Sequence, residues 1–349
     1  METSTTMTVG IDISDRHSHL CFLDESGEVM RRMKVPTTEI GFRKAFEGEK
    51  PKLVALEAST HSPWISRLLS ELAHEVLVAN PRQLKLISES HTKNDANDAE
   101  LLARMARADK KLLRPVHHRS REAQLELAII QVRKNLVATR SKLINAMRGL
   151  AKSQGERIRT CSTAKFYEAA TASLSPGLLA QLQPLLETVS QVSQRIEEQN
   201  QKIEALVEKH PVAQKLTAIH GVGPVTSTSF VLTLDDERRF SSSRKVGAFI
   251  GLCPRQDQSG KLEKQLGITK AGDAELRVLL VNCAQGILRK GAPDSDLKRW
   301  GLKLASRGGK NAKKRAAVAV ARKLAVLMHR LWVTGATYEP LYRSRLQPT

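Results

Sequence analysis

Short apolar runs dominate the pattern at the start of the chain. Val9–Ile13 reads as a buried strand, because nearly every position in it is apolar. His19–Leu23 and Val29–Val35 flank the sequence DESGE, which is typical of a turn. We therefore expect these three strands to form an antiparallel meander.

The next segments alternate between helix and strand. Thr38 is placed to cap a short helix that ends at Phe46, and Pro63 opens a second helix. Leu53–Ala58 and Val76–Ala79 are further buried strands. Three strands followed by strand, helix and strand predict a mixed sheet of the RNase H type.

The middle of the chain has a helical pattern. Residues 119–152 contain no proline, and no glycine before Gly149, which predicts one long helix. Residues 160–184 are rich in Ser, Thr and Pro and predict a loop with short helical pieces. The apolar residues that follow recur at 4-3 spacing, which predicts a helical hairpin that packs on itself, an intermolecular coiled coil, or both in one oligomer. The heptad positions are Leu185, Val189, Val192, Ile196, Gln199, Ile203 and Leu206.

The last third of the chain begins with a glycine pair. Gly221 and Gly223 lie between two apolar helices and resemble a helix–hairpin–helix motif, whose glycines let backbone N–H groups approach a phosphate. The alternative is a tight turn between helices. Residues 255–261 predict a polar loop, and Asp273–Leu288 predicts a helix.

The fold class predicted from these patterns is α/β plus α. It consists of a mixed sheet with helices, a central helical coiled coil and a mainly helical C-terminal domain with a helix–hairpin–helix-like motif. The expected domains are residues 1–115, 116–212 and 213–349, and a chain of 349 residues is long enough for two or three domains.

Charge adds an expected partner. The formal net charge is +20, and Leu297–Arg330 carries eleven Lys or Arg residues without an acid. Bases also far outnumber acids from Arg104 to Arg159. A charge run often forms no more than a solvated face, but two long acid-poor segments favour a nucleic-acid surface.

Several classes of protein are excluded by composition. No apolar run reaches membrane-spanning length, and the N-terminus lacks a signal-peptide pattern. The four cysteines form no CxxC pair and read as reduced thiols. We expect a cytoplasmic protein with no membrane partner, associated with the nucleoid when it acts.

Four carboxylates are the candidate chemistry. Asp12 and Glu57 end apolar runs, where a buried acid is costly unless it meets a cation. Asp95 and Asp98 are three residues apart at the expected start of a helix and so share one face. Four such acids suit one or two Mg²⁺ ions, which can assist the cleavage of a DNA or RNA phosphodiester. Simpler readings of the helix acids are an N-cap for Asp95 and a favourable dipole contact for Asp98.

Several short motifs, taken together and in order, resemble one family. VGIDIS, ALEAS, KNDANDAELLARM, AIHGVGPVT, FIGLCPRQDQSGK and GITKAGDAELRVLL are similar to motifs of the DEDD-type insertion-sequence transposases, which are related to Piv-type DNA invertases. The resemblance covers most of the chain and omits chiefly the central helices. It departs from the family at Asn94, where Thr is common, and at Lys261, where a second Gly is common.

The resemblance implies a fold and a mechanism. The N-terminal domain would be RuvC-like, with the family's four acids at Asp12, Glu57, Asp95 and Asp98. A nucleophilic serine would stand at Ser259. Donor and target DNA would be paired by a structured guide RNA, and the protein would act as a homodimer or homotetramer.

Residues that would hold phosphates near the serine are weaker candidates. Their cationic side chains can pair with phosphate oxygens. They are Arg255, Lys261, Lys270 and Arg277, beside the backbone of Gly221 and Gly223.

Two other functions stay open. One is a RuvC-like metal-dependent nuclease or junction resolvase that uses water as the nucleophile. The other is a nucleic-acid-binding protein without catalysis. Tyr167, Tyr338 and Tyr342 lie outside any Arg/His constellation, so a tyrosine recombinase is not expected.

Overall fold

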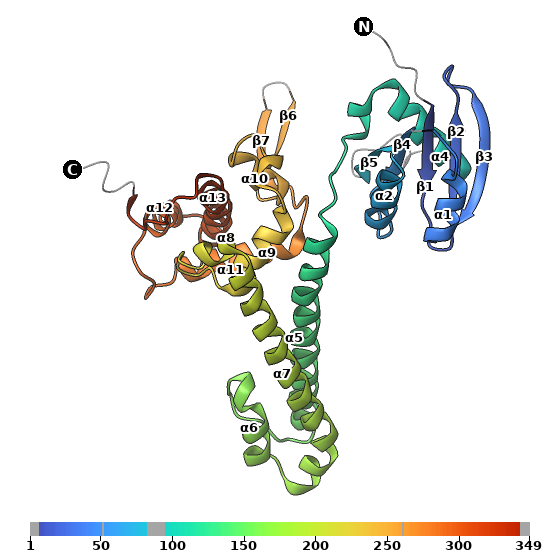
Figure 1. Cartoon of the computed structure of the whole chain (residues 1–349). Helices are drawn as coiled ribbons and strands as arrows, with labels where there is room; N and C mark the ends of the chain where they lie inside the picture. Colours follow the sequence, from blue (N-terminus) through green and yellow to red (C-terminus); the bar gives the residue numbers. More distant parts are fainter. Residues whose placement is uncertain (1–6, 51, 82–94, 260–261, 343–349) are drawn as a thin grey trace. The chain divides into compact units, whose positions relative to one another are not determined.

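The computed structural model describes residues 7–50, 52–81, 95–259 and 262–342. Within these ranges, the side chains of residues 95, 256–259 and 262–265 lie outside the description. The chain divides into two compact units, Met1–His118 and Arg119–Thr349 (Figure 1). No helix in the described ranges is both long and apolar enough to cross a membrane.

The first unit is built on a five-stranded sheet with the order β3-β2-β1-β4-β5. β1 pairs antiparallel with β2 and parallel with β4; β2–β3 is antiparallel and β4–β5 parallel. The mixed α/β sheet predicted from the sequence is thus confirmed. The strands are β1 (Thr8–Asp12), β2 (His17–Leu23), β3 (Val29–Pro36), β4 (Leu53–Glu57) and β5 (Glu75–Ala79).

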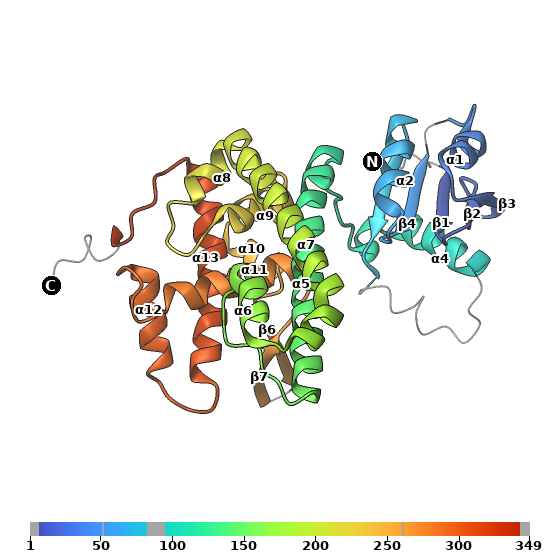
Figure 2. The same ribbon diagram turned by 90° about the horizontal axis from the view of Figure 1, so that it is seen from below.

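Helices cover both faces of this sheet (Figure 2). α1 (Glu39–Phe46) and α2 (Ser62–Glu71) pack on the face that carries Val9 and Ile11. α4 (Asp95–Ala108) and the short 3-10 helix Lys110–Leu113 pack on the opposite face. The predicted cap is present, since the Thr38 hydroxyl accepts a hydrogen bond from the backbone N–H of Gly41.

The second unit begins with two long helices that pack side by side (Figure 1). They are α5 (Arg121–Ser153) and α7 (Pro176–Lys209). They run antiparallel, because Arg133 contacts Asn200 whereas Arg140, further along α5, contacts Ser193, earlier in α7. The 3-10 helix Thr163–Lys165 and α6 (Phe166–Ser173) lie between them in the chain.

Most of the heptad residues of α7 are buried within the chain, where α7 packs on α5. They are Val189, Ile196, Ile203 and Leu206. This burial favours the helical hairpin over the intermolecular coiled coil, which stays a prediction. The loop with short helical pieces expected at 160–184 is present up to Ser175, with the 3-10 helix and α6 as its helical pieces. From Pro176 onward the prediction is wrong, because α7 begins there and carries Pro184 inside it.

Short helices then surround one apolar helix. α9 (Pro224–Leu234) is buried on all sides from Thr226 to Leu234, as expected for an apolar helix in a core. It packs in one hydrophobic cluster with α8 (Pro211–Leu216), which precedes it, and with four helices that follow it. These are α10 (Arg244–Phe249), α11 (Ala274–Ile287), α12 (Asp296–Ala305) and α13 (Ala312–Thr334), and the 3-10 helix Glu237–Arg239 lies between α9 and α10 in the chain.

The polar loop expected at 255–261 is a strand over most of its length. β6 (Pro254–Ser259) pairs antiparallel with β7 (Leu262–Ile268) in a two-stranded sheet. Sequence reasoning missed it because Arg, Gln, Asp and Ser lack the apolar alternation of a half-buried strand. Backbone pairing in a small hairpin does not need that alternation.

One buried carboxylate joins the two long helices. Glu126 on α5 lies 2.7 Å from the Lys209 ammonium and 2.6 Å from His210 Nε2, at the end of α7. Burial opposes ionisation, but the hydrogen bonds from Lys209 and His210 outweigh it and hold the pKa of Glu126 below its usual value. A lowered pKa in the folded state stabilises the hairpin at neutral pH.

Glu126→Gln is expected to lower the free energy of unfolding at pH 7 by about 1.5–3 kcal/mol, because a charge-assisted hydrogen bond is lost. The contribution of Glu126 is fully present above its unfolded-state pKa of about 4.3 and is lost as the pH falls through the lower folded-state pKa. Urea unfolding at pH 7 and pH 3 should therefore show a difference that shrinks in acid. Glu122→Gln, which removes an exposed partner of the same lysine, is the control. A difference of equal size at both pH values would contradict this.

Candidate active site

Asp12 and Glu57 stand side by side at one edge of the first unit's sheet. Ile11 pairs with Leu56 in the parallel register of β1 and β4, so Asp12 and Glu57 are the next positions on neighbouring strands. Neighbouring strands lie about 4.8 Å apart. Both side chains are half-buried. They point to the same face as Gly10 and Ala55, two residues earlier in each strand.

That face is the one covered by α4. A Cβ atom on Gly10 would lie 1.9 Å from the carbonyl oxygen of Ala99 and 2.6 Å from the amide nitrogen of Ala103. The backbone of α4 therefore rests directly on β1, which no side chain larger than hydrogen at residue 10 would allow.

The direction of α4 decides where its acids lie. Arg104 and Arg107, in the second half of α4, donate hydrogen bonds to the carbonyls of Gly27 and Asp24. This turn follows Leu23, which pairs with Thr8 at the start of β1. The second half of α4 thus lies at the beginning of β1, and its first turn lies toward the carboxyl end, where Asp12 and Glu57 stand.

The structure thus brings the first turn of α4 toward the strand acids. Asp98 in this turn is half-buried, and Asp95 begins the helix, although its side chain lies outside the described residues. Among the side chains that are described, no group of three or more His, Cys, Asp or Glu forms a metal-binding cluster. The oxygen donors nevertheless fit a hard divalent ion, because carboxylates are its preferred protein ligands.

Sequence reasoning missed two residues in the same row. Asp12 pairs with His19 on β2, and His19 pairs with Lys34 on β3, so the row runs Glu57–Asp12–His19–Lys34 across four strands. Lys34 is exposed, and its ammonium makes no ion pair with any described residue. The register of the predicted meander was the signal that would have placed both residues beside Asp12.

Glu100 fixes α4 to the edge strand. It accepts hydrogen bonds from Arg104, at 2.8 Å, and from Arg32 on β3. These bonds, with that from Arg104 the strongest, hold the pKa of Glu100 below its usual value. Glu100 is thus an ionised anchor of the helix.

The β6–β7 hairpin of the second unit carries Ser259. Ser259 ends β6 and pairs with Leu262, so its backbone lies at the closed end of the hairpin. Gly260, Lys261 and the side chain of Ser259 lie outside the described residues. The structure therefore describes the backbone position of Ser259, and its hydroxyl lies outside the description.

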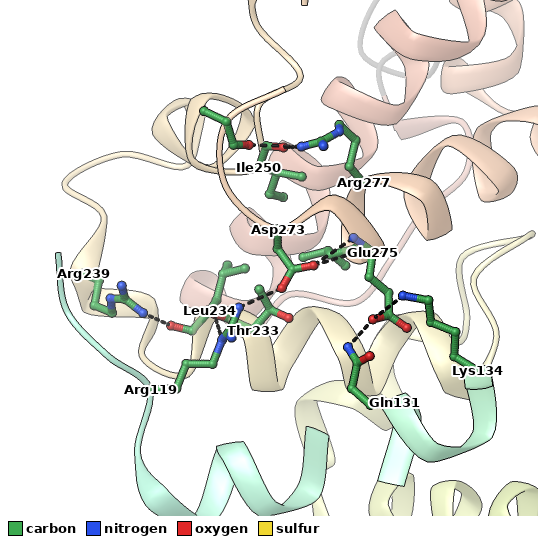
Figure 3. A network of polar contacts seen from close by, with 12 residues as sticks. Arg119, Gln131, Lys134, Thr233, Leu234, Arg239, Ile250, Asp273, Glu275 and Arg277 are labelled. Atoms are coloured by element: carbon green, nitrogen blue, oxygen red, sulfur yellow. Dashed lines mark hydrogen bonds and ion pairs between the residues drawn. The ribbon is translucent and has the colours of Figure 1, made fainter. Parts of the chain in front are cut away.

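The base of this hairpin is tightly held. A Cβ on Gly251 would lie 2.1 Å from the Ala271 oxygen, and one on Gly272 would lie 1.9 Å from the Phe249 oxygen. Both glycines also have positive φ angles, 77° and 71°. Arg277 on α11 donates hydrogen bonds to the carbonyls of Ile250 and Ala271, at 2.8 and 3.0 Å (Figure 3). The two chain segments that lead into and out of the hairpin are thus clamped together.

A second polar network holds the helices beneath this clamp (Figure 3). Arg119 donates to the carbonyl of Thr233, at the end of α9, and to Asp273, at 2.9 Å. Asp273 also caps α11 by accepting from the backbone N–H groups of Glu275 and Leu276. This network ties the starts of α5 and α11 to the end of α9, so the hairpin stands on a rigid platform.

Comparison with known proteins decides the family. Residues 9–153 match the DEDD type of the IS110 family, described as transposase, and residues 213–298 match the family described as transposase IS116/IS110/IS902. The transposase for insertion sequence element IS1111A of Coxiella burnetii is 30% identical over 95% of this chain and 90% of its own length. The chain belongs to the IS110 family of insertion-sequence transposases.

Two further relatives agree with this assignment. A probable family 20 transposase of Pseudomonas aeruginosa is 29% identical over 95% of the chain and 98% of its own length. The transposase for insertion sequence element IS1328 of Yersinia enterocolitica is 28% identical, over 81% of the chain and 84% of its own length. The resemblance drawn from the sequence motifs is confirmed, and the protein is an enzyme that acts on DNA.

The transposase uses several of the predicted phosphate contacts in other ways. Arg277 is engaged by two backbone carbonyls. Gly221 has a φ of +87°, and a Cβ there would lie 3.1 Å from the Cys283 oxygen on α11, so close packing accounts for this glycine. Gly223 is the N-cap of α9. Arg255 and Lys270 are exposed, Lys261 lies outside the described residues, and phosphate binding by any of these residues stays a prediction.

Gly10→Ala should separate α4 from β1 in the transposase. The new methyl group cannot fit 1.9 Å from a carbonyl oxygen, so α4 must move, at a cost of about 1–3 kcal/mol in the free energy of unfolding. DNA cleavage should fall as well, because the acids of α4 move away from Asp12 and Glu57. Gly149→Ala, where nothing lies within 4 Å, should instead leave the stability unchanged or raise it by about 0.5–1 kcal/mol. Thermal unfolding and a cleavage assay check both variants, and a fully active Gly10→Ala enzyme would contradict the close approach.

Proposed function

We propose that the transposase cuts and rejoins DNA through a covalent phosphoserine at Ser259, with Asp12, Glu57, Asp95 and Asp98 holding one or two Mg²⁺ ions. The observation that carries the proposal is the adjacent register of Asp12 and Glu57 beneath the first turn of α4. The first unit would act as a RuvC-like domain, for which this mixed sheet with acids at its carboxyl edge is suited.

The proposed reaction has two steps, cleavage and rejoining. The Ser259 oxygen forms a bond to phosphorus as its proton is lost to a base, and the bond from phosphorus to the departing strand oxygen breaks. The strand end leaves as a hydroxyl after gaining a proton. A hydroxyl of another strand then gives up its proton and forms a bond to phosphorus, the bond from phosphorus to the serine oxygen breaks, and that oxygen regains a proton, so the phosphodiester bond energy is conserved for rejoining. Mg²⁺, when bound, withdraws negative charge from the phosphate oxygens.

The chain's own residues orient the substrate. Lys34 lies two strands from Asp12 on the same row, about 10 Å away at the usual strand spacing. Its ammonium, which makes no ion pair within the described ranges, is placed to hold a phosphate next to the one at the acids. Arg255 and Lys270 are exposed at the base of the serine hairpin and would hold phosphates there.

A structured guide RNA would pair donor and target DNA, and the enzyme would act as a dimer or tetramer in which the acids of one subunit serve the serine of another. The resemblance supports both features. The excess of bases from Arg104 to Arg159 supports RNA binding through backbone and shape, because this segment contains no aromatic residue. The alternative function remains a RuvC-like nuclease or junction resolvase that uses water.

Asp12→Asn and Asp98→Asn should each abolish strand cleavage and leave DNA binding largely intact. Loss of a direct ligand should exceed the roughly 10–100-fold loss that follows removal of an outer-shell partner. Isothermal titration with Mg²⁺ should show weakened binding in both variants. Glu71→Gln, an exposed acid on α2, is the control and should change neither property. Cleavage at the normal rate by both Asn variants would sink the carboxylate assignment.

Ser259→Ala should eliminate a covalent protein–DNA adduct that the unmodified enzyme forms on a nicked substrate, as seen on denaturing gels. The variant should still bind DNA and Mg²⁺, because the carboxylates are untouched. Reactions contain the structured transcript of the element, and its omission should also prevent the adduct. Cleavage by Ser259→Ala that leaves free DNA ends would favour water as the nucleophile and the nuclease alternative.

A further inference from the structure

A large groove in the second unit lies apart from the hairpin tip that carries Ser259. Its volume is about 1440 Å³. It is lined by α12, α13, the segment 338–342 and the ends of β6 and β7 that lie at the base of the hairpin. Figures 1 and 2 both show α12 and α13 as neighbours, and these helices pack against each other. Of the residues given a role in the proposed chemistry of the acids and the serine, Lys270 alone lines this groove, at its edge near the base of the hairpin.

The charge of the groove is strongly unbalanced. Seven Lys or Arg residues and two carboxylates line it. α13 supplies most of the cations and contains no acid. Lys314, Arg322 and Arg330 follow one another at eight-residue intervals, which places them about 12 Å apart along the helix axis.

Four of the groove cations make no ion pair within the part of the chain that the structure describes. Lys314, Arg322 and Arg330 are exposed, as is Arg244 on the facing α10, and none of the four makes an ion pair with a side chain in the described ranges. Exposed cations on a helix without acids create a positive potential, which a polyanion in the groove would neutralise.

The floor between the cations is apolar and partly aromatic. Val318, Val326 and Leu327 are half-buried there, with Trp300 on α12 and Tyr338 beside them. The Lys323 ammonium lies 4.2 Å from the centre of the Trp300 ring. Cations that alternate with flat apolar surface suit single-stranded nucleic acid, whose phosphates and bases are both accessible. A duplex shows mainly its phosphates to such a surface and would leave the floor uncovered.

We propose that this groove binds a single strand of DNA, with Lys314, Arg322 and Arg330 on its phosphates and the apolar floor under its sugars and bases. The choice of DNA follows from the enzyme's activity, because strand cleavage and rejoining expose single-stranded ends. The inference does not depend on Ser259 as nucleophile or on the acids as metal ligands.

The test uses the full-length transposase and a fluorescein-labelled oligo(dT) of about 20 nucleotides. The triple variant Lys314→Gln, Arg322→Gln, Arg330→Gln should bind more weakly, and its salt dependence should fall by roughly 0.7 per lost contact, or about 2 in total. The control is Lys165→Gln, Lys202→Gln, Lys215→Gln, which removes the same charge from exposed sites elsewhere in the unit. Anisotropy titrations at several salt concentrations give both slopes.

Several results would overturn the proposal. They are an unchanged slope in the groove variant, an equal loss in the control variant, or preference of the groove for duplex DNA, for RNA of the same length or for an acidic peptide. If the triple variant unfolds at a lower temperature than the unmodified enzyme, the single variant Arg330→Gln replaces it. Its salt dependence of oligo(dT) binding should then fall by roughly 0.7. Asp12→Asn and Ser259→Ala should keep normal oligo(dT) binding, so failure of the proposed chemistry is distinguishable from failure of this site.

Discussion

The close approach of α4 to β1 at Gly10 is the contact on which the candidate acid site depends. A helix can rest this closely on a strand only where the strand residue has no side chain, and Ala99 and Ala103 supply the small surface on the helix side. This contact sets the height of α4 above the sheet. The ion pair of Glu100 with Arg32 on β3, and the hydrogen bonds of Arg104 and Arg107 to the turn after β2, then set its direction. Together they carry the first turn of α4 to the edge where Asp12 and Glu57 end their strands.

In the second unit, the contacts at its base hold the small β6–β7 hairpin rigidly. Two strands alone are marginally stable in water. Gly251 and Gly272 let the two ends of the hairpin touch backbone to backbone, and Arg277 bridges the carbonyls beside them. Beneath this clamp, the buried helix α9 and the Arg119–Asp273 bond supply a fixed base. A nucleophile at the closed end of such a hairpin would be held out from the core yet limited in its motion.

The two candidate chemistries lie in separate compact units. Carboxylates occupy the first unit and Ser259 the second. The long α5–α7 hairpin begins directly after the first unit, and most of the heptad residues of α7 are buried within the chain, where α7 packs on α5. The hairpin is therefore a structural part of the second unit. Some exposed cations make no ion pair among the described residues, namely Lys34 in the first unit and Lys314, Arg322 and Arg330 in the second. They are the positions at which we propose that a polyanion lies on each unit.

Much of this protein follows from local patterns. Apolar runs placed Asp12 and Glu57 at strand ends, the turn sequence DESGE predicted the meander, and the order of motifs identified the family. The strand nature of residues 254–259 did not follow, because polar residues in a hairpin leave no periodic signal. Nor did the choice between a hairpin and an intermolecular coiled coil for the α7 heptad, the role of Glu100 or the row of His19 and Lys34. These features depend on strand register and on contacts between residues far apart in the chain. The side-chain periodicity of a strand or a helix, 2.0 or 3.6 residues, predicts which face a side chain occupies, but not which element packs against that face.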